Sequence, residues 1–150
     1  VTLKFLAVEQ SFALTDIKTQ HQAHCCRFAR TIRAKKASNP TWFDFKTLCG
    51  GPRSQNDYLE ISNLFHTVLL SEVPYMPPKM ASEARRFTWL IDVFYDHKVK
   101  LIISAEVPAE NLYTEGPMAN EFHRTVSRII EMQSKEYLEA PRRIVDTSLT

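Results

Sequence analysis

The sequence predicts an α/β domain with a small, mainly parallel sheet flanked by helices. From residue 41 onward, short runs of apolar and β-branched residues alternate with longer segments whose apolar residues recur at helical spacing. Strands that alternate with helices in this way pair in parallel through right-handed crossovers. The length of 150 residues suits one domain with a single core.

Three strands are predicted in the alternating region. Each is short and rich in apolar, β-branched or aromatic residues, which is typical of buried strands. Pro40 precedes the first strand and Pro74 follows the second. The predicted strands are Thr41 to Phe45, Thr67 to Val73, and Val99 to Ala105.

Helices are predicted between and after these strands. Ser54 lies three residues before Asp57, an arrangement typical of a helix start, and the helix it opens is Gln55 to Phe65. The best apolar stripe at helical spacing lies in Ser82 to His97. A second long helix is predicted at Asn120 to Leu138.

The remaining segments are shorter or less regular. The prolines of Tyr75 to Pro78 predict an extended loop, and Pro108 to Tyr113 is predicted as one short helical turn. Basic residues that alternate with small ones predict a two-sided strand over Arg30 to Ala37. These patterns divide the chain into a poorly defined segment at residues 1–29, one α/β domain at residues 30–140 and a polar tail at residues 141–150.

The glycine content excludes two common nucleotide-binding motifs. The chain contains only three glycines, Gly50, Gly51 and Gly116, whereas average usage of about 7% would give roughly ten. A Walker A loop needs two glycines and a lysine at fixed spacing, and a Rossmann fingerprint needs three glycines. Neither motif is present, so we expect no phosphate-binding loop of either kind in this sequence.

Charge, hydropathy and cysteine count exclude further classes. A net charge of +2 is too small to indicate nucleic-acid binding, and the basic run Arg27 to Lys36 is typical of a solvated strand face. No stretch approaches the roughly 18 apolar residues of a membrane span. Three cysteines form no closed disulfide framework, and an odd count favours a reducing compartment.

No metal site or catalytic nucleophile is predicted. His21, His24, Cys25 and Cys26 lie close together in the sequence. Adjacent cysteines rarely supply two ligands to one zinc ion, and no second pair of ligands follows at zinc-finger spacing. A cysteine nucleophile would also need a base partner, and none can be identified from the sequence.

Polar residues end the three predicted strands. They are Asp44 after the first, Ser71 and Glu72 after the second, and Ser104 and Glu106 after the third. Functional groups of open α/β sheets gather at such ends, so Glu72, Ser104 and Glu106 are strand-end candidates. The alternative is that these carboxylates cap a helix or face solvent, because position in a fold alone is weak evidence of catalysis.

Two pairs of arginines are the other candidates. Arg124 and Arg128 stand four residues apart and share one helix face, whereas Arg85 and Arg86 are adjacent near the start of another helix. Paired guanidinium groups bind phosphate or reach across a subunit interface. The alternative is surface ion pairing with nearby glutamates, and both interpretations remain open at this point.

Four blocks of the sequence resemble one protein family. In chain order they are FDFKTLCGGPRSQNDYLEI, FHTVLLSEVP, ARRFTWLIDVFYDHKVKLIISAEVPAENLY and FHRTVSRIIEMQSKEYL. With near-family spacing over about residues 30 to 140, they closely resemble the carboxyl-terminal portion of the ZapE-type ATPases. Those are bacterial cell-division proteins related to mitochondrial AFG-type AAA+ ATPases.

The resemblance implies a P-loop ATPase whose phosphate loop and Walker B strand lie upstream of the matching blocks. It implies ATP and magnesium as ligands of the full-length parent, and neither for this chain alone. The implied partners are the upstream ATPase core, the tubulin-like GTPase of the division ring and further copies of the chain, in the bacterial cytoplasm.

The resemblance also selects residues for contacts between domains or subunits, or near a nucleotide. Arg85 and Arg86 fall on the family's ARRF segment. Arg124, Ser127 and Arg128 fall on its FxRTxSR segment. Residues 1 to about 29 do not read like the family.

The expected function is that of the carboxyl-terminal fragment of an ATP-hydrolysing cell-division ATPase, which does not hydrolyse ATP by itself. The alternative is a protein-interaction module that docks onto the division machinery and takes no part in nucleotide chemistry. A third hypothesis, an independent small enzyme that uses Glu72 and Glu106, requires both carboxylates to face one closed pocket.

Overall fold

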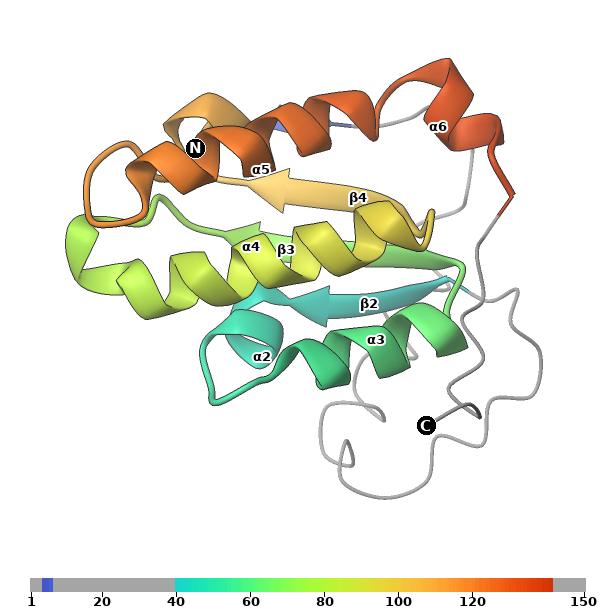
Figure 1. The fold of residues 1–150 in the computed structure, drawn as a ribbon, viewed down its shortest axis with the longest axis horizontal. Coiled ribbons are helices and arrows are strands. Elements are labelled where there is room, and N and C mark those ends of the chain that lie inside the picture. The colour runs from blue at the N-terminus through green and yellow to red at the C-terminus, as the bar shows by residue number, and fades with distance from the viewer. Residues whose placement is uncertain (1–3, 7–39, 142–150) are drawn as a thin grey trace.

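The computed structural model describes residues 4–6 and 40–141. These residues form a four-stranded sheet with the strand order β1-β4-β3-β2 (Figure 1). The three longer strands pair in parallel, whereas β1 runs antiparallel to β4. The strands are β1 (Lys4–Leu6), β2 (Thr41–Asp44), β3 (Thr67–Val73) and β4 (Lys100–Ala105). The prediction of a small, mainly parallel sheet is confirmed.

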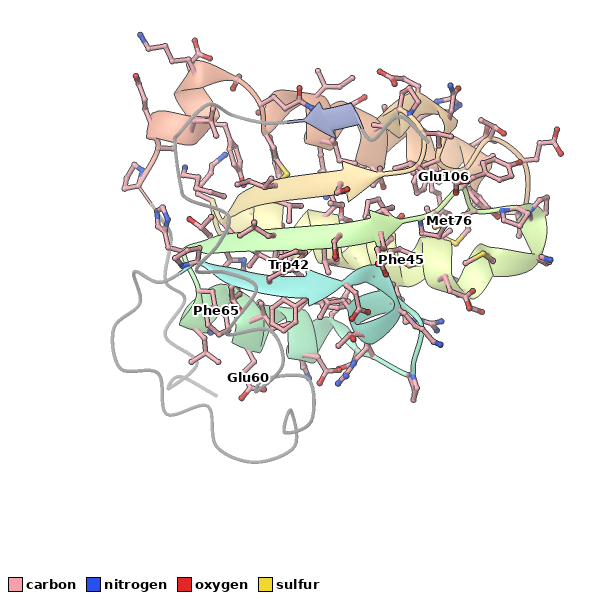
Figure 2. All side chains as sticks on the ribbon, turned by 180° about the vertical axis from the view of Figure 1, so that it is seen from behind. Trp42, Phe45, Glu60, Phe65, Met76 and Glu106 are labelled. Carbon is pink, nitrogen blue, oxygen red and sulfur yellow. The ribbon has the colours of Figure 1, made fainter. Side chains whose placement is uncertain are left out.

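The helices that follow the parallel strands all lie on one face of the sheet. In Figure 1, α3, α4 and α5 lie in front of the strands, and in Figure 2 the sheet is seen from its other face with these helices behind it. The helices are α2 (Phe45–Cys49), α3 (Gln55–Leu64), α4 (Ala81–Asp96), α5 (Ala119–Glu131) and α6 (Lys135–Glu139), and two short 3₁₀ turns are η1 (Pro78–Met80) and η2 (Ala109–Asn111).

Topology explains this one-sided arrangement. Strands β2, β3 and β4 are neighbours in the same order as in the sequence, so both crossovers step across the sheet in one direction. A right-handed crossover places its helix on a side that depends only on that direction. Both connecting helices are therefore on the same side, and the core lies between that side and the helices.

Alternation along β3 separates the two faces. Val68 and Leu70 are buried against the helices, whereas Leu69 and Ser71 are half-buried on the opposite side. The helix layer contributes large, fully buried side chains to the same core. They include Tyr58 from α3, Phe87, Leu90, Ile91 and Phe94 from α4, and Phe122 from α5.

The predicted strand Thr41 to Phe45 ends one residue too late. Asp44 ends β2 and caps the next helix, because its carboxylate accepts hydrogen bonds from the Thr47 amide at 2.6 Å and the Thr47 hydroxyl at 3.0 Å. Phe45 is therefore the first residue of α2, a helix that the sequence pattern does not predict. Five residues are too few to show a helical period.

The predicted helix Asn120 to Leu138 is two helices. α5 ends at Glu131, and α6 begins at Lys135 after Ser134, whose hydroxyl accepts a hydrogen bond from the Tyr137 amide at 3.2 Å. A capping serine explains the break, because its side chain competes for backbone donors that would otherwise continue the first helix.

Most other boundaries agree with the predictions to within one or two residues. β3 matches its prediction, the turn over Pro108 to Tyr113 contains η2, and the predicted loop over Tyr75 to Pro78 leads into η1. Strand β1 was not predicted, because three residues show no period. The predicted strand Arg30 to Ala37 and the cluster from His21 to Cys26 lie outside the described residues.

The short helix α6 is tied to the sheet through Lys100. The ammonium group of Lys100 donates hydrogen bonds to the carbonyl oxygens of Tyr137 at 2.6 Å and Ala140 at 2.9 Å. The Tyr137 hydroxyl donates to the carbonyl oxygens of Phe94 and Val99. Burial lowers the pKa of Lys100 and raises that of Tyr137.

The carboxyl end of α4 uses a lysine where glycine is usual. Lys98 has a φ of 57°. Its amide donates a hydrogen bond to the carbonyl oxygen of Tyr95, and the Val99 amide donates one to the carbonyl oxygen of Phe94. The Lys98 ammonium lies 4.7 Å from the centroid of the Tyr95 ring and 4.5 Å from that of Tyr137. These cation–π contacts offset the cost of the left-handed backbone.

Two substitutions at this position separate the side-chain contact from the backbone cost. Lys98→Ala loses the cation–π contacts and keeps the left-handed cost, so we expect the free energy of unfolding to fall by about 1 kcal/mol. Lys98→Gly loses the same contacts but removes the cost of the left-handed backbone. Its free energy of unfolding should therefore remain close to that of the unsubstituted chain. Urea denaturation at 25 °C measures both variants, and an alanine variant as stable as the glycine variant would refute this account.

Candidate functional site

The carboxyl ends of the parallel strands meet at one edge of the sheet, where the strand-end candidates lie. Glu72 is exposed and has a φ of 59°, at an irregularity between Leu70 and Val73 where the β3–β4 register shifts. Such a bulge aims its side chain away from the regular face of a strand. Glu72 thus projects into solvent at this edge.

Glu106 lies at the same edge, beyond the arrowheads of β3 and β4 (Figure 2). Its carboxylate accepts a hydrogen bond from the Tyr75 amide at 3.1 Å, which ties the loop after β3 to the end of β4. Because Glu72 and Glu106 are both exposed, they do not meet the condition of a shared closed pocket that an independent small enzyme requires.

The strand-end serines lie on the sheet face without helices. The Ser71 hydroxyl accepts a hydrogen bond from the indole nitrogen of Trp42 at 2.7 Å, which joins β3 to β2. Ser104 is half-buried, and its Cα is paired with that of Phe5 in β1. Both serines are followed by further strand residues and not by the turn that presents a serine nucleophile.

Arg86 links the start of α4 to the end of α2. Its Nε donates a hydrogen bond of 2.6 Å to the carbonyl oxygen of Cys49, and its guanidinium lies 3.7 Å from the Glu83 carboxylate. Neighbouring Arg85 is exposed, and its Nε lies 3.3 Å from the Met118 sulfur before α5.

In the second arginine pair, too, one arginine is held by neighbouring groups and the other is exposed. Arg128 forms an ion pair with Asp92 of α4 and lies 5.1 Å from the centroid of the Tyr95 ring. The Tyr95 hydroxyl in turn donates a 2.7 Å hydrogen bond to Glu131. Arg128 is only 14% exposed in its side chain, so it serves packing between α4 and α5.

Arg124 lies one turn before Arg128 on α5, and it is exposed. Within residues 40–141 it forms no ion pair with a carboxylate. Ser127, also on the FxRTxSR segment, donates its hydroxyl to the His123 carbonyl at 3.0 Å within the same helix. Of the four candidate arginines, Arg85 and Arg124 are exposed, whereas Arg86 and Arg128 are held by neighbouring groups.

Two features of the described residues bear on whether they could hold ATP with magnesium. No group of three or more His, Cys, Asp or Glu side chains in the described part of the chain is placed to hold a metal ion. Gly50 and Gly51 precede α3, but a carboxylate already occupies the start of that helix. The Asp57 carboxylate accepts a hydrogen bond of 2.7 Å from the Ser54 amide. A carboxylate there repels phosphate. No described helix has the length and apolar character needed to cross a bilayer.

Comparison with known proteins identifies the family. The family model described as "AFG1-like ATPase" matches residues 7–141. The chain therefore belongs to the AFG1-like ATPase family, and the resemblance to ZapE-type ATPases is confirmed. Because the match begins at residue 7, the expectation that residues 1 to about 29 do not read like the family is wrong for residues 7–29.

Three curated relatives are similar over part of their length. "Cell division protein ZapE" of Escherichia coli is 54% identical over 95 residues, which are 63% of this chain and 25% of that protein. "Lactation elevated protein 1 homolog B" of Danio rerio is 36% identical over 125 residues, covering 62% and 25% respectively.

The third relative is an uncharacterized protein of Schizosaccharomyces pombe, 30% identical over 150 residues that cover 81% of this chain and 33% of the relative. The chain thus spans about a quarter to a third of the length of these relatives. No solved structure matches it.

The buried thiol beside Arg86 makes stability depend on pH. Burial raises the pKa of Cys49 to about 12, above the usual value near 8.5 to 9. Above pH 9 the unfolded thiol loses its proton and the folded one keeps it, so stability falls as pH rises, by up to about 1.4 kcal/mol per pH unit. In Cys49→Ala, the free energy of unfolding should therefore decrease less steeply between pH 9 and 10.

Urea denaturation at pH 8, 9 and 10 measures this slope in the parent chain and in Cys49→Ala. Burial raises the pKa of Tyr58 and of Tyr137 in both proteins. The smaller part of the rise that Cys49 causes at Tyr58 is lost in Cys49→Ala, which acts in the same direction as the loss of the thiol. Parallel slopes for the two proteins would contradict a protonated Cys49 in the folded state.

The two arginines of α5 should differ in their effect on stability. Arg128→Ala leaves the half-buried Asp92 carboxylate without its cation, so we expect a loss of about 1–2 kcal/mol in the free energy of unfolding. Arg124→Ala is the matched control on the same helix and should change it by less than about 0.5 kcal/mol. Urea denaturation checks both, and equal losses would show that Arg124 also has a structural partner.

Proposed function

We propose that this chain is the carboxyl-terminal part of an ATP-hydrolysing AFG1-like ATPase of ZapE type, and that it does not hydrolyse ATP by itself. The observation that carries the proposal is that a member of an ATPase family has no Walker A motif in its 150 residues. The relatives' greater length supports it, because an ATPase core can occupy the part that this chain does not match.

In this proposal ATP and magnesium are bound by the ATPase core of the full-length parent. The residues described above stabilise that core and supply one or two arginines to it or to a neighbouring subunit. Arg124 is the first choice and Arg85 the second, because both guanidinium groups are exposed. An arginine that reaches a transferring phosphoryl group stabilises the negative charge of its transition state.

A role in cell division is part of the proposal. It is supported by the name of the Escherichia coli relative, a cell division protein. The proposed partners are the tubulin-like GTPase of the division ring and further copies of the chain, with the bacterial cytoplasm as location. The domain is proposed to span residues 30–140.

The second candidate is an interaction module without any role in nucleotide chemistry. Its support is that two of the four candidate arginines are already held inside the chain, Arg86 by Glu83 and Arg128 by Asp92. On this hypothesis the exposed arginines contact a protein partner, and ATP turnover in a full-length protein does not depend on them.

Isothermal titration of the isolated 150-residue chain with ATP and Mg²⁺ tests the first proposal. We expect no binding in the micromolar range, because the sequence has no Walker A motif and the described residues contain no group of three or more potential metal ligands. Micromolar affinity would contradict the assignment of nucleotide contacts to the ATPase core.

Arg124→Ala separates the two candidates. We place the substitution in a chimaera in which this chain replaces the matching stretch of Escherichia coli ZapE. A phosphate-contacting arginine should lower kcat of ATP hydrolysis by about 10²-fold or more, with little change in stability. Unchanged turnover together with weaker binding to a division partner would instead favour the interaction module.

A further inference from the structure

Tyr113 has a buried hydroxyl group without a hydrogen-bond partner. The residue is 2% exposed, and its ring packs against that of Phe122 in α5, with the two ring centroids 5.5 Å apart. Among the described residues, the Tyr113 hydroxyl neither donates nor accepts a hydrogen bond. A hydroxyl that gives up water on burial and gains no partner destabilises the conformation that buries it. The conformation that covers Tyr113 is therefore disfavoured by this group.

The cover over this hydroxyl is the loop that leads into α5, drawn in orange in Figure 1. A Cβ atom built on Gly116 would lie 2.2 Å from the Tyr113 hydroxyl oxygen, so the Gly116 backbone passes directly over that oxygen. Gly116 has a φ of 128°, a conformation that residues with a side chain rarely adopt. The loop residues Thr114, Glu115, Gly116 and Pro117 are all exposed. We call residues 114–117 the latch.

Few interactions hold the latch closed. Within the described residues, a single hydrogen bond joins it to the rest of the chain, from the Ala119 amide to the Gly116 carbonyl oxygen at 3.2 Å. That distance is at the long end of the usual range for such a bond. Exposed segments with few hydrogen bonds and little buried surface open locally at low free energy. When the latch opens, water reaches the Tyr113 hydroxyl, and this hydration favours the open form.

The latch is connected to Arg85 through Met118. Met118 directly follows the latch and is 4% exposed, and its sulfur lies 3.3 Å from Nε of Arg85. Because Met118 is bonded to Pro117, opening of the latch moves Met118 and breaks its contact with Arg85. Arg85 is one of the two exposed arginines that the proposed function assigns to contacts with the ATPase core or a neighbouring subunit.

We propose that the latch is a conformational switch that controls Arg85. In the closed form it buries the Tyr113 hydroxyl and leaves Arg85 in contact with Met118, whereas in the open form the hydroxyl is hydrated and Arg85 is released. The use of the released Arg85 rests on the proposed function, but the opening of the latch does not. A partner that contacts the released Arg85 binds the open form more tightly, and it therefore shifts the latch toward that form.

Oxidation of methionine by hydrogen peroxide, measured by peptide mass spectrometry on the full 150-residue chain, tests the switch. Met118 and Met132 are matched probes, because they flank α5 and are 4% and 6% exposed. We expect Met118 to be oxidised several-fold faster than Met132, since the latch opens locally. Tyr113→Phe removes the hydroxyl that favours the open form. It should slow the oxidation of Met118 by about fivefold and leave that of Met132 unchanged.

Tyr58→Phe is the matched control variant, because Tyr58 is also buried but its hydroxyl donates a 2.8 Å hydrogen bond to the Leu48 carbonyl oxygen. It should not slow the oxidation of Met118. The proposal is overturned if Met118 is oxidised no faster than Met132 in the unsubstituted chain. It is also overturned if Tyr113→Phe leaves the oxidation of Met118 unchanged or speeds it, because the hydroxyl would then be hydrogen-bonded in the closed form. ATP turnover of the chimaera with Escherichia coli ZapE reports on the proposed function independently, so the two can fail separately.

Discussion

The direction of two crossovers is the constraint on which this structure depends. Strands β2, β3 and β4 follow one another across the sheet in chain order, and right-handed connections then place every crossover helix on one face. A doubly wound sheet reverses direction once, and that reversal creates both a second helix layer and the crevice in which such folds bind ligands. The parallel strands of the described residues, β2, β3 and β4, show no such reversal.

Polar contacts then fix the helix layer in place. Arg86 joins α4 to the end of α2, and Arg128 joins α5 to Asp92 of α4. Lys100 reaches from β4 to the last carbonyl oxygens of α6. Each cation is half-buried, so it contributes more than an exposed ion pair would. Arg85 and Arg124, by contrast, stay exposed.

More of the fold than of the candidate site could be predicted from the sequence. Apolar runs and helical periods located β3 and α3 closely, because burial in a sheet or on one helix face imposes those periods. The break before α6 escaped prediction, since Ser134 acts through a single cap. The ion pair of Arg128 with Asp92 could not be predicted either, because residues 36 positions apart meet only through tertiary packing. Nothing local distinguishes Arg124, which is exposed, from Arg128, which is not.

A crystal structure of the chimaera with a non-hydrolysable ATP analogue and Mg²⁺ would show directly which part of the polypeptide binds the nucleotide. We expect the backbone amides around the phosphates and the carboxylates around the metal to come from the ATPase core. Exposed arginines of α4 or α5 should be the sole contribution of residues 40–141. Phosphates cradled by backbone amides of residues 40–141, or magnesium held by their carboxylates, would contradict this expectation.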